Sequence, residues 1–68
     1  MKKALKLLKE EGFTAKIVGN YIEVSGVRPN IVEQLFIARD GSISTDVLKN
    51  GEEIGCRNFS DIEEYVFS

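Results

Sequence analysis

Histidine is absent from this 68-residue sequence, and that absence excludes several common kinds of active site. Histidine is the usual general base near neutral pH, and a catalytic triad that uses it cannot form within one such chain. Four-ligand zinc sites are built from cysteine and histidine, whereas the only cysteine here is Cys56. A single cysteine also excludes an intramolecular disulfide. We therefore expect no bound metal.

Long apolar runs and glycine-rich loops are also missing. No run approaches the ~18–20 apolar residues that a membrane-spanning helix needs. Near the N-terminus, Leu5, Leu7 and Leu8 are interrupted by Lys6 and Lys9, unlike the apolar core of a signal peptide. No Gly-x-Gly sequence is present to hold a phosphate group. These absences predict a cytoplasmic protein with no membrane partner and no cofactor.

The net charge of −2 provides no general attraction to nucleic acid or to anionic lipid. The charge is unevenly distributed, because lysines gather in residues 1–9 and acidic residues in residues 51–68. With 43% hydrophobic and 29% charged residues, the composition is ordinary for a globular chain. We expect one domain over residues 1–68, near the lower size limit for an independent core.

The strongest local pattern is Asn50-Gly51 between two extended runs. Both central residues of a type I′ turn have positive φ, which Asn and Gly tolerate best, so this dipeptide predicts a tight β-hairpin. A two-residue loop places Val47 opposite Ile54, and Cys56 then falls on the same face. We therefore predict that all three side chains face the core and that the Cys56 thiol is buried and inert.

A second hairpin is predicted around Gly19-Asn20, since glycine in the first position suits a type II′ turn. The two-residue loop pairs Val18 with Tyr21 on the face that points away from the core. Lys16 falls opposite Glu23 on the same face, and opposite charges directly across a strand pair support this register.

The segment over residues 31–39 allows two interpretations. Asn30 followed by Glu33 resembles a capping box, and the apolar residues after Asn30 have helical spacing. A strand over residues 33–38 is favoured, because the turn after it would place Gly41 as a left-handed bulge residue in a three-residue hairpin loop. A helical turn at the start of the segment is compatible with this strand.

Both ends of the chain are predicted to be helical. The first helix, residues 2–11, should end at Gly12 in a Schellman motif that returns Phe13 to the last turn. The last helix should begin at Ser60, whose hydroxyl would accept a hydrogen bond from the third helical amide while Glu63 reaches back.

These elements predict a small α+β domain in which a mainly antiparallel sheet of four to five strands carries an N-terminal and a C-terminal helix on one face, in the order α-ββ-βββ-α. The side chains expected on the covered face of the sheet are Phe13, Ala15, Ile17, Ile22, Val24, Leu35, Ile37, Ile43, Val47, Ile54 and Cys56. The helices and the segment before the last helix would add Leu5, Leu8, Phe59, Ile62 and Val66.

The uncovered face of the sheet is the candidate binding surface. An apolar patch with a polar rim is typical of partner sites, and aromatic residues and arginine are enriched there. The alternative is an ordinary solvated face with scattered apolar residues. The candidate binding residues are Val18, Tyr21, Phe36, Leu48, Lys16 and Arg57.

From this face we predict a non-enzymatic protein-interaction module, similar to a small adaptor or inhibitor. It would bind a protein partner, or itself as a homodimer, through the uncovered face or an edge strand. The alternative is a weak single-stranded nucleic-acid-binding protein that uses lysines of the first helix with Lys16, Tyr21 and Arg57. That alternative is less favoured, because Glu23 lies among these residues. An enzyme is not expected, since the carboxylates occur at turns and helix ends, away from any cleft that would perturb their pKa values.

Overall fold

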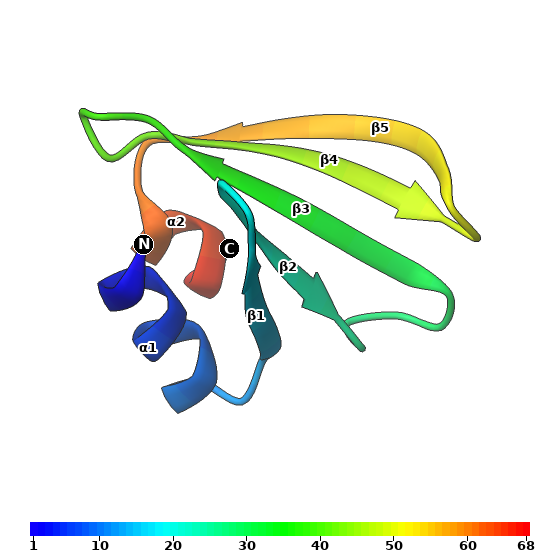
Figure 1. The fold of residues 1–68 in the computed structure, drawn as a ribbon, viewed down its shortest axis with the longest axis horizontal. Helices are drawn as coiled ribbons and strands as arrows, with labels where there is room; N and C mark the ends of the chain where they lie inside the picture. Colours follow the sequence, from blue (N-terminus) through cyan, green and yellow to red (C-terminus); the bar gives the residue numbers. More distant parts are fainter.

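The computed structural model describes residues 1–68 and contains one five-stranded antiparallel sheet with two helices against the same face (Figure 1). In chain order the elements are α1 (Lys2–Glu10), β1 (Thr14–Val18), β2 (Tyr21–Ser25), β3 (Ile31–Ile37), β4 (Ile43–Lys49), β5 (Glu52–Phe59) and α2 (Ile62–Phe67). The strand order in the sheet follows the chain, β1-β2-β3-β4-β5. The predicted α+β architecture and its element order are therefore confirmed.

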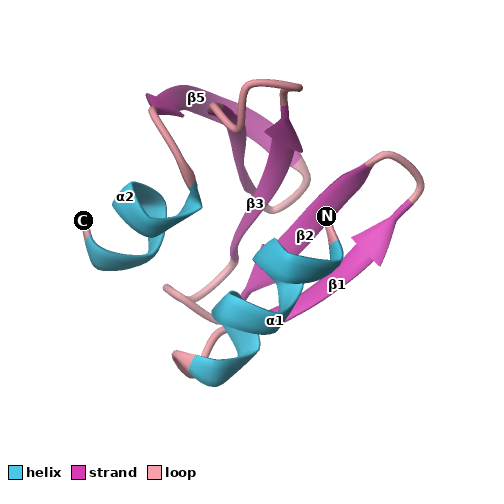
Figure 2. Ribbon diagram, turned by 90° about the vertical axis from the view of Figure 1, so that its left-hand side faces the viewer, coloured by secondary structure: helices cyan, strands magenta, loops and turns pink.

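The helices cover only part of the sheet. Figure 1 shows both of them beneath one end of the strands, while β3, β4 and β5 extend beyond them. Figure 2 shows α1 against β1 and β2, and α2 below β5. Neither helix is long and apolar enough to cross a membrane.

The turns that define the sheet have the predicted conformations. Asn50 and Gly51 both have positive φ, 52° and 84°, as a type I′ turn requires. Gly41 has a φ of 91°, and the loop that contains it pairs Ile37 with Ile43 as predicted. The hairpin of β1 and β2 also has the predicted register throughout.

Residues 31–37 form a strand, which confirms the strand interpretation and excludes a helix there. A turn precedes the strand, with Asn30 at a φ of 64° and the Ile31 amide donating to the Arg28 carbonyl. β3 lies between β2 and β4, so its backbone is hydrogen-bonded on both sides. This pairing overrides the weak helical preference of the local sequence.

The hairpin of β4 and β5 departs from the predicted register. A bulge between Val47 and Leu48 shifts the pairing, so Val47 lies opposite Gly55 and Ile54 has no partner. The predicted Val47–Ile54 pair is therefore wrong, and Ile54 is 56% exposed. One extra residue on a bulged strand moves every later side chain to the other face. Cys56 consequently leaves the core face, and Arg57 enters it opposite Thr45.

Cys56 is exposed on the uncovered face, which contradicts the predicted buried thiol. We therefore expect a thiol reagent to label Cys56 in the native protein at close to the rate measured in denaturant, because access rather than unfolding limits the reaction. The two rates can be compared by mass spectrometry of quenched samples. A native rate lower by orders of magnitude would contradict this placement.

The core lies between the helices and the covered face. Its buried apolar residues are Ala4, Leu8, Ile22, Val24, Ile31, Leu35, Ile43, Val47 and Tyr65. Ile17 was predicted to belong to it, but on the edge strand β1 this side chain stays 40% exposed. Two polar residues, Glu33 and Thr45, are also buried on the covered face, where each alternates with apolar core residues of its own strand.

The two helix ends differ in how well the sequence predicted them. At the end of α1, Gly12 has a φ of 90° and the Phe13 amide donates to the Leu8 carbonyl, which confirms the Schellman motif. The predicted Ser60 cap of α2 is wrong by one residue. Asp61 is the N-cap and accepts from the Glu64 amide at 2.8 Å. Ser60 instead donates its amide and hydroxyl hydrogens to the Glu64 carboxylate, because an overlapping Asp-x-x-Glu pattern is equally suited to capping.

Candidate functional site

The sheet brings five of the six predicted binding residues together on its uncovered face. Lys16 and Val18 lie on β1, Tyr21 on β2, Phe36 on β3 and Leu48 on β4. The pairing of neighbouring strands puts these residues on one face of the sheet. Along each strand they alternate with side chains that point toward the core, so they lie on the face away from the helices.

The centre of this face is an aromatic pair. The rings of Tyr21 and Phe36 have centroids 5.4 Å apart and are tilted by 42°. The Gln34 amide nitrogen donates to the Tyr21 hydroxyl at 3.4 Å. Such tilted pairs are favourable beyond their buried area, so the two rings form one preordered apolar surface.

Val32 belongs to the same face and was missed by the sequence analysis. It lies directly opposite Leu48, and both side chains are half-buried. The predicted strand began at Glu33, one residue too late to include it. A strand starting at residue 31 would have placed Val32 and Phe36 on one face by alternation alone.

A hollow of about 690 Å³ lies where this face meets the loop between β2 and β3. Val32 and Leu48 line it from the strands, and Val27 and Pro29 line it from the loop. Its size lies within the range of sites that accept ligands or inserted side chains. The aromatic pair and this hollow occupy the two ends of the uncovered face.

The charges of the uncovered face are mostly acidic. Lys16 and Glu23 form an ion pair of 3.8 Å between side chains that are 70% and 29% exposed. Exposed pairs of this kind contribute little to stability. Asp46 and Glu53 share the face through their pairing with Gln34 and Leu48, and Arg28 of the loop between β2 and β3 lines the hollow at one end of the face.

Arg57, the sixth predicted binding residue, lies on the covered face, and its assignment to the uncovered face is therefore wrong. The β4–β5 bulge turns its side chain inward. There its Nη2 donates to both oxygens of the Glu33 carboxylate, at 3.1 and 3.3 Å. The lysines of α1 also belong to the helix-bearing side of the sheet (Figure 2). Of the residues of the nucleic-acid alternative, Lys16 and Tyr21 therefore share the uncovered face, whereas Arg57 and the lysines of α1 lie on the other side of the sheet.

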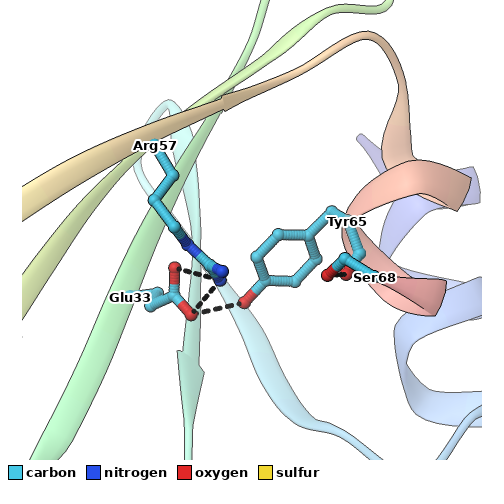
Figure 3. A network of polar contacts seen from close by, with 4 residues as sticks. All are labelled: Glu33, Arg57, Tyr65 and Ser68. Carbon is cyan, nitrogen blue, oxygen red and sulfur yellow. Dashed lines mark hydrogen bonds and ion pairs between the residues drawn. The ribbon is translucent and has the colours of Figure 1, made fainter.

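Arg57 belongs to a buried polar network that joins β3, β5 and α2 (Figure 3). The Glu33 side chain is 5% exposed, and it also accepts a hydrogen bond from the Tyr65 hydroxyl at 3.1 Å. The Arg57 guanidinium lies over the Phe59 ring, 5.0 Å from its centroid. A buried carboxylate persists only when it is paired and hydrogen-bonded, and these contacts meet that condition.

Burial raises the pKa of the Tyr65 phenol above its ordinary value of 10.0, and the Glu33 charge and hydrogen bond raise it further. The folded state therefore keeps this proton at a pH where the unfolded chain loses it, and stability must fall as the pH rises above 10. We expect Tyr65→Phe to make this fall less steep by up to about 1.4 kcal/mol per pH unit. Urea unfolding between pH 7 and pH 11 measures it. Equal slopes in the two proteins would contradict the assignment.

No protein-family model, curated protein or solved structure matches this chain. The functional assignment therefore depends on the uncovered face and the buried network. In the network, the Glu33 carboxylate is paired with Arg57 and hydrogen-bonded to Tyr65 of α2. On the uncovered face, adjoining apolar side chains lie next to solvent.

Proposed function

We propose that this protein is a non-enzymatic interaction module, similar to a small adaptor or inhibitor. It binds a protein partner, or a second copy of itself, through the uncovered face of the sheet, in the cytoplasm. The observation that carries the proposal is the continuity of Val18, Tyr21, Phe36, Val32 and Leu48 across four strands of a face that no helix covers. Contiguous apolar patches of this kind mark interaction sites on small proteins.

The energetics of this face favour a covering partner. Its apolar side chains are half-buried, because neighbours shield their flanks and leave their outer surfaces in water. Complete burial of such a side chain is worth roughly 1.5–3 kcal/mol relative to full exposure, and a partner would add the part of this energy that the half-buried state lacks. Aromatic residues are enriched at the centres of interfaces, and the Tyr21–Phe36 pair is already ordered before binding.

The face is a better candidate than the sheet edges. β5 is the longer edge strand, but it carries Glu52 and Glu53 and the β4–β5 bulge interrupts its pairing. Charges and bulges are the usual features that prevent a further strand from adding to an edge. β1, the other edge strand, is short and has Lys16 at its centre.

Two features support the protein-binding interpretation over its alternatives. The acidic excess on the uncovered face would repel a phosphate backbone, which disfavours single-stranded nucleic acid. The one buried carboxylate, Glu33, already accepts hydrogen bonds from Arg57 and Tyr65. It is therefore better suited to a structural role than to a role in proton transfer.

The proposal predicts that the double change Tyr21→Ser with Phe36→Ser abolishes association. The matched control is Phe67→Ser, which removes an apolar side chain that is 64% exposed on α2. Sedimentation equilibrium reports self-association, and affinity purification from expressing cells reports other partners. Only the change on the uncovered face should weaken binding.

Salt dependence separates the protein partner from a nucleic acid. Association through apolar surface should hold between 50 and 500 mM salt, whereas phosphate contacts weaken by orders of magnitude over such a range. A folded Tyr21/Phe36 variant that retains every partner of the parent protein would refute the proposal. Loss of binding in the control variant to the same extent would also refute it.

A further inference from the structure

A second hollow, of about 330 Å³, lies on the helix side of the sheet beside α2 and shares Val27 and Arg28 of the loop between β2 and β3 with the first hollow. Glu33 and Arg57 line it from the sheet, and Tyr65 lines it from α2. Arg28 reaches it from the loop between β2 and β3. The hollow therefore adjoins the buried network, whose three side chains converge in Figure 3.

The guanidinium of Arg57 has donors to spare in this hollow. Only its Nη2 is engaged by the protein, in the two contacts to Glu33. The Nη1 and Nε groups have no protein acceptor, and the side chain is 49% exposed. Packing over the Phe59 and Tyr65 rings holds the guanidinium plane in place. An oriented guanidinium with free N–H groups is a natural binding site for an oxyanion.

The charges in the hollow favour one negative charge on the ligand. Among the side chains that line the hollow, Arg28 and Arg57 carry two positive charges and Glu33 carries one negative charge. Arg28 makes no ion pair within the protein, so its charge remains available. A carboxylate carries one negative charge and matches this balance, whereas a phosphate dianion would bring a second charge toward Glu33.

The remaining walls indicate an apolar body on the ligand. Phe13, Val27 and Val66 line the hollow beside the charged groups. Ligand sites typically combine apolar walls with a few polar groups that fix orientation, and a volume near 300 Å³ suits a small molecule. We propose that this hollow binds a small organic carboxylate with an aromatic or branched apolar body, its oxygens on Arg57 and Arg28.

Benzoate tests this assignment with the intact protein, by titration followed in two-dimensional amide NMR spectra. We expect saturable shifts in the amides of Arg28, Glu33 and Arg57. Benzamide has the same shape without the charge, and it should bind at least about tenfold more weakly, as loss of a charge-assisted hydrogen bond implies. N-acetylphenylalanine distinguishes the two sources of the carboxylate: tighter binding than benzoate indicates a chain terminus, and weaker binding a free acid.

The variant Arg28→Gln should weaken benzoate binding by about tenfold, because it removes one charged contact. Arg39→Gln removes the same charge from the exposed loop between β3 and β4 and should change binding less than about twofold. The proposal is overturned if benzoate produces no saturable shifts, or if benzamide or inorganic phosphate binds as tightly. Equal effects of the Arg28 and Arg39 changes would overturn it as well.

Discussion

Replacing Arg57 with leucine should lower the free energy of unfolding by about 3 kcal/mol, the lower end of the cost of breaking a buried ion pair. The leucine would leave the Glu33 carboxylate, 5% exposed, with the Tyr65 hydroxyl as its one remaining partner. The lower end applies because half of the Arg57 side chain is exposed, so water can partly replace it. Urea unfolding monitored by circular dichroism measures the change.

Two further variants separate the lost pair from lost packing. Arg39→Leu removes an exposed arginine in the loop between β3 and β4 and should be neutral within about 0.5 kcal/mol. Adding Glu33→Gln to the Arg57→Leu variant should recover much of the stability, since a neutral amide costs less to bury than an unpaired carboxylate. If Glu33→Gln lowered stability further in that background, the carboxylate would not be the source of the penalty.

Replacing Leu35 with alanine should cost about 3 kcal/mol, within the usual range for a leucine in a well-packed core. Leu35 is completely buried on the central strand, where it pairs with Ile22 and Thr45 and belongs to the same core cluster as Leu8 of α1. Thermal and urea unfolding of the purified variant provide the measurement.

The matched control for Leu35 is Ile54→Ala, which tests the bulge as well. The uninterrupted register predicts a cost of roughly 2–4 kcal/mol for Ile54, because it would place this side chain in the core. In the structure Ile54 is unpaired and 56% exposed, so the expected change is within about 0.5 kcal/mol. Similar losses for Leu35 and Ile54 would contradict the bulge.

The sequence determined most of the sheet because its turns are strongly encoded. Asn50-Gly51 and Gly19-Asn20 each favour one tight turn, and a two-residue loop fixes the pairs beside it. The strand pairs that a turn defines can be predicted only as far as the first bulge in the hairpin. The bulge near Val47 depends on how the long hairpin twists, and no residue pattern requires it. Gly55, beside the bulge, has no side chain that the irregular pairing would displace.

The same reasoning explains which parts of the candidate site were predicted. Tyr21 and Phe36 lie on strands whose pairing the bulge does not interrupt, so the alternation of side chains along each strand placed them on the correct face. Arg57 lies beyond the bulge and moved to the other face. The partners of Glu33 are 24 and 32 residues away in the chain, and a glutamate in a strand gives no local indication of such distant contacts. Buried polar networks of this kind become visible only when the fold is known.

The central claim is that the uncovered face contacts a protein partner, and photo-crosslinking in living cells tests it most directly. A photoreactive amino acid replaces Ser44, which is exposed on β4 directly opposite Phe36. In a control variant it replaces Lys6, exposed on α1. Both positions reach solvent, so they differ in the surface that they sample and not in accessibility.

After irradiation, we predict covalent protein adducts from position 44 that resist nuclease treatment and are absent from position 6. Adducts of twice the protomer mass would identify a second copy as the partner, and other masses would identify a different protein. The absence of adducts at position 44, or equal adducts at both positions, would contradict a binding role for the uncovered face.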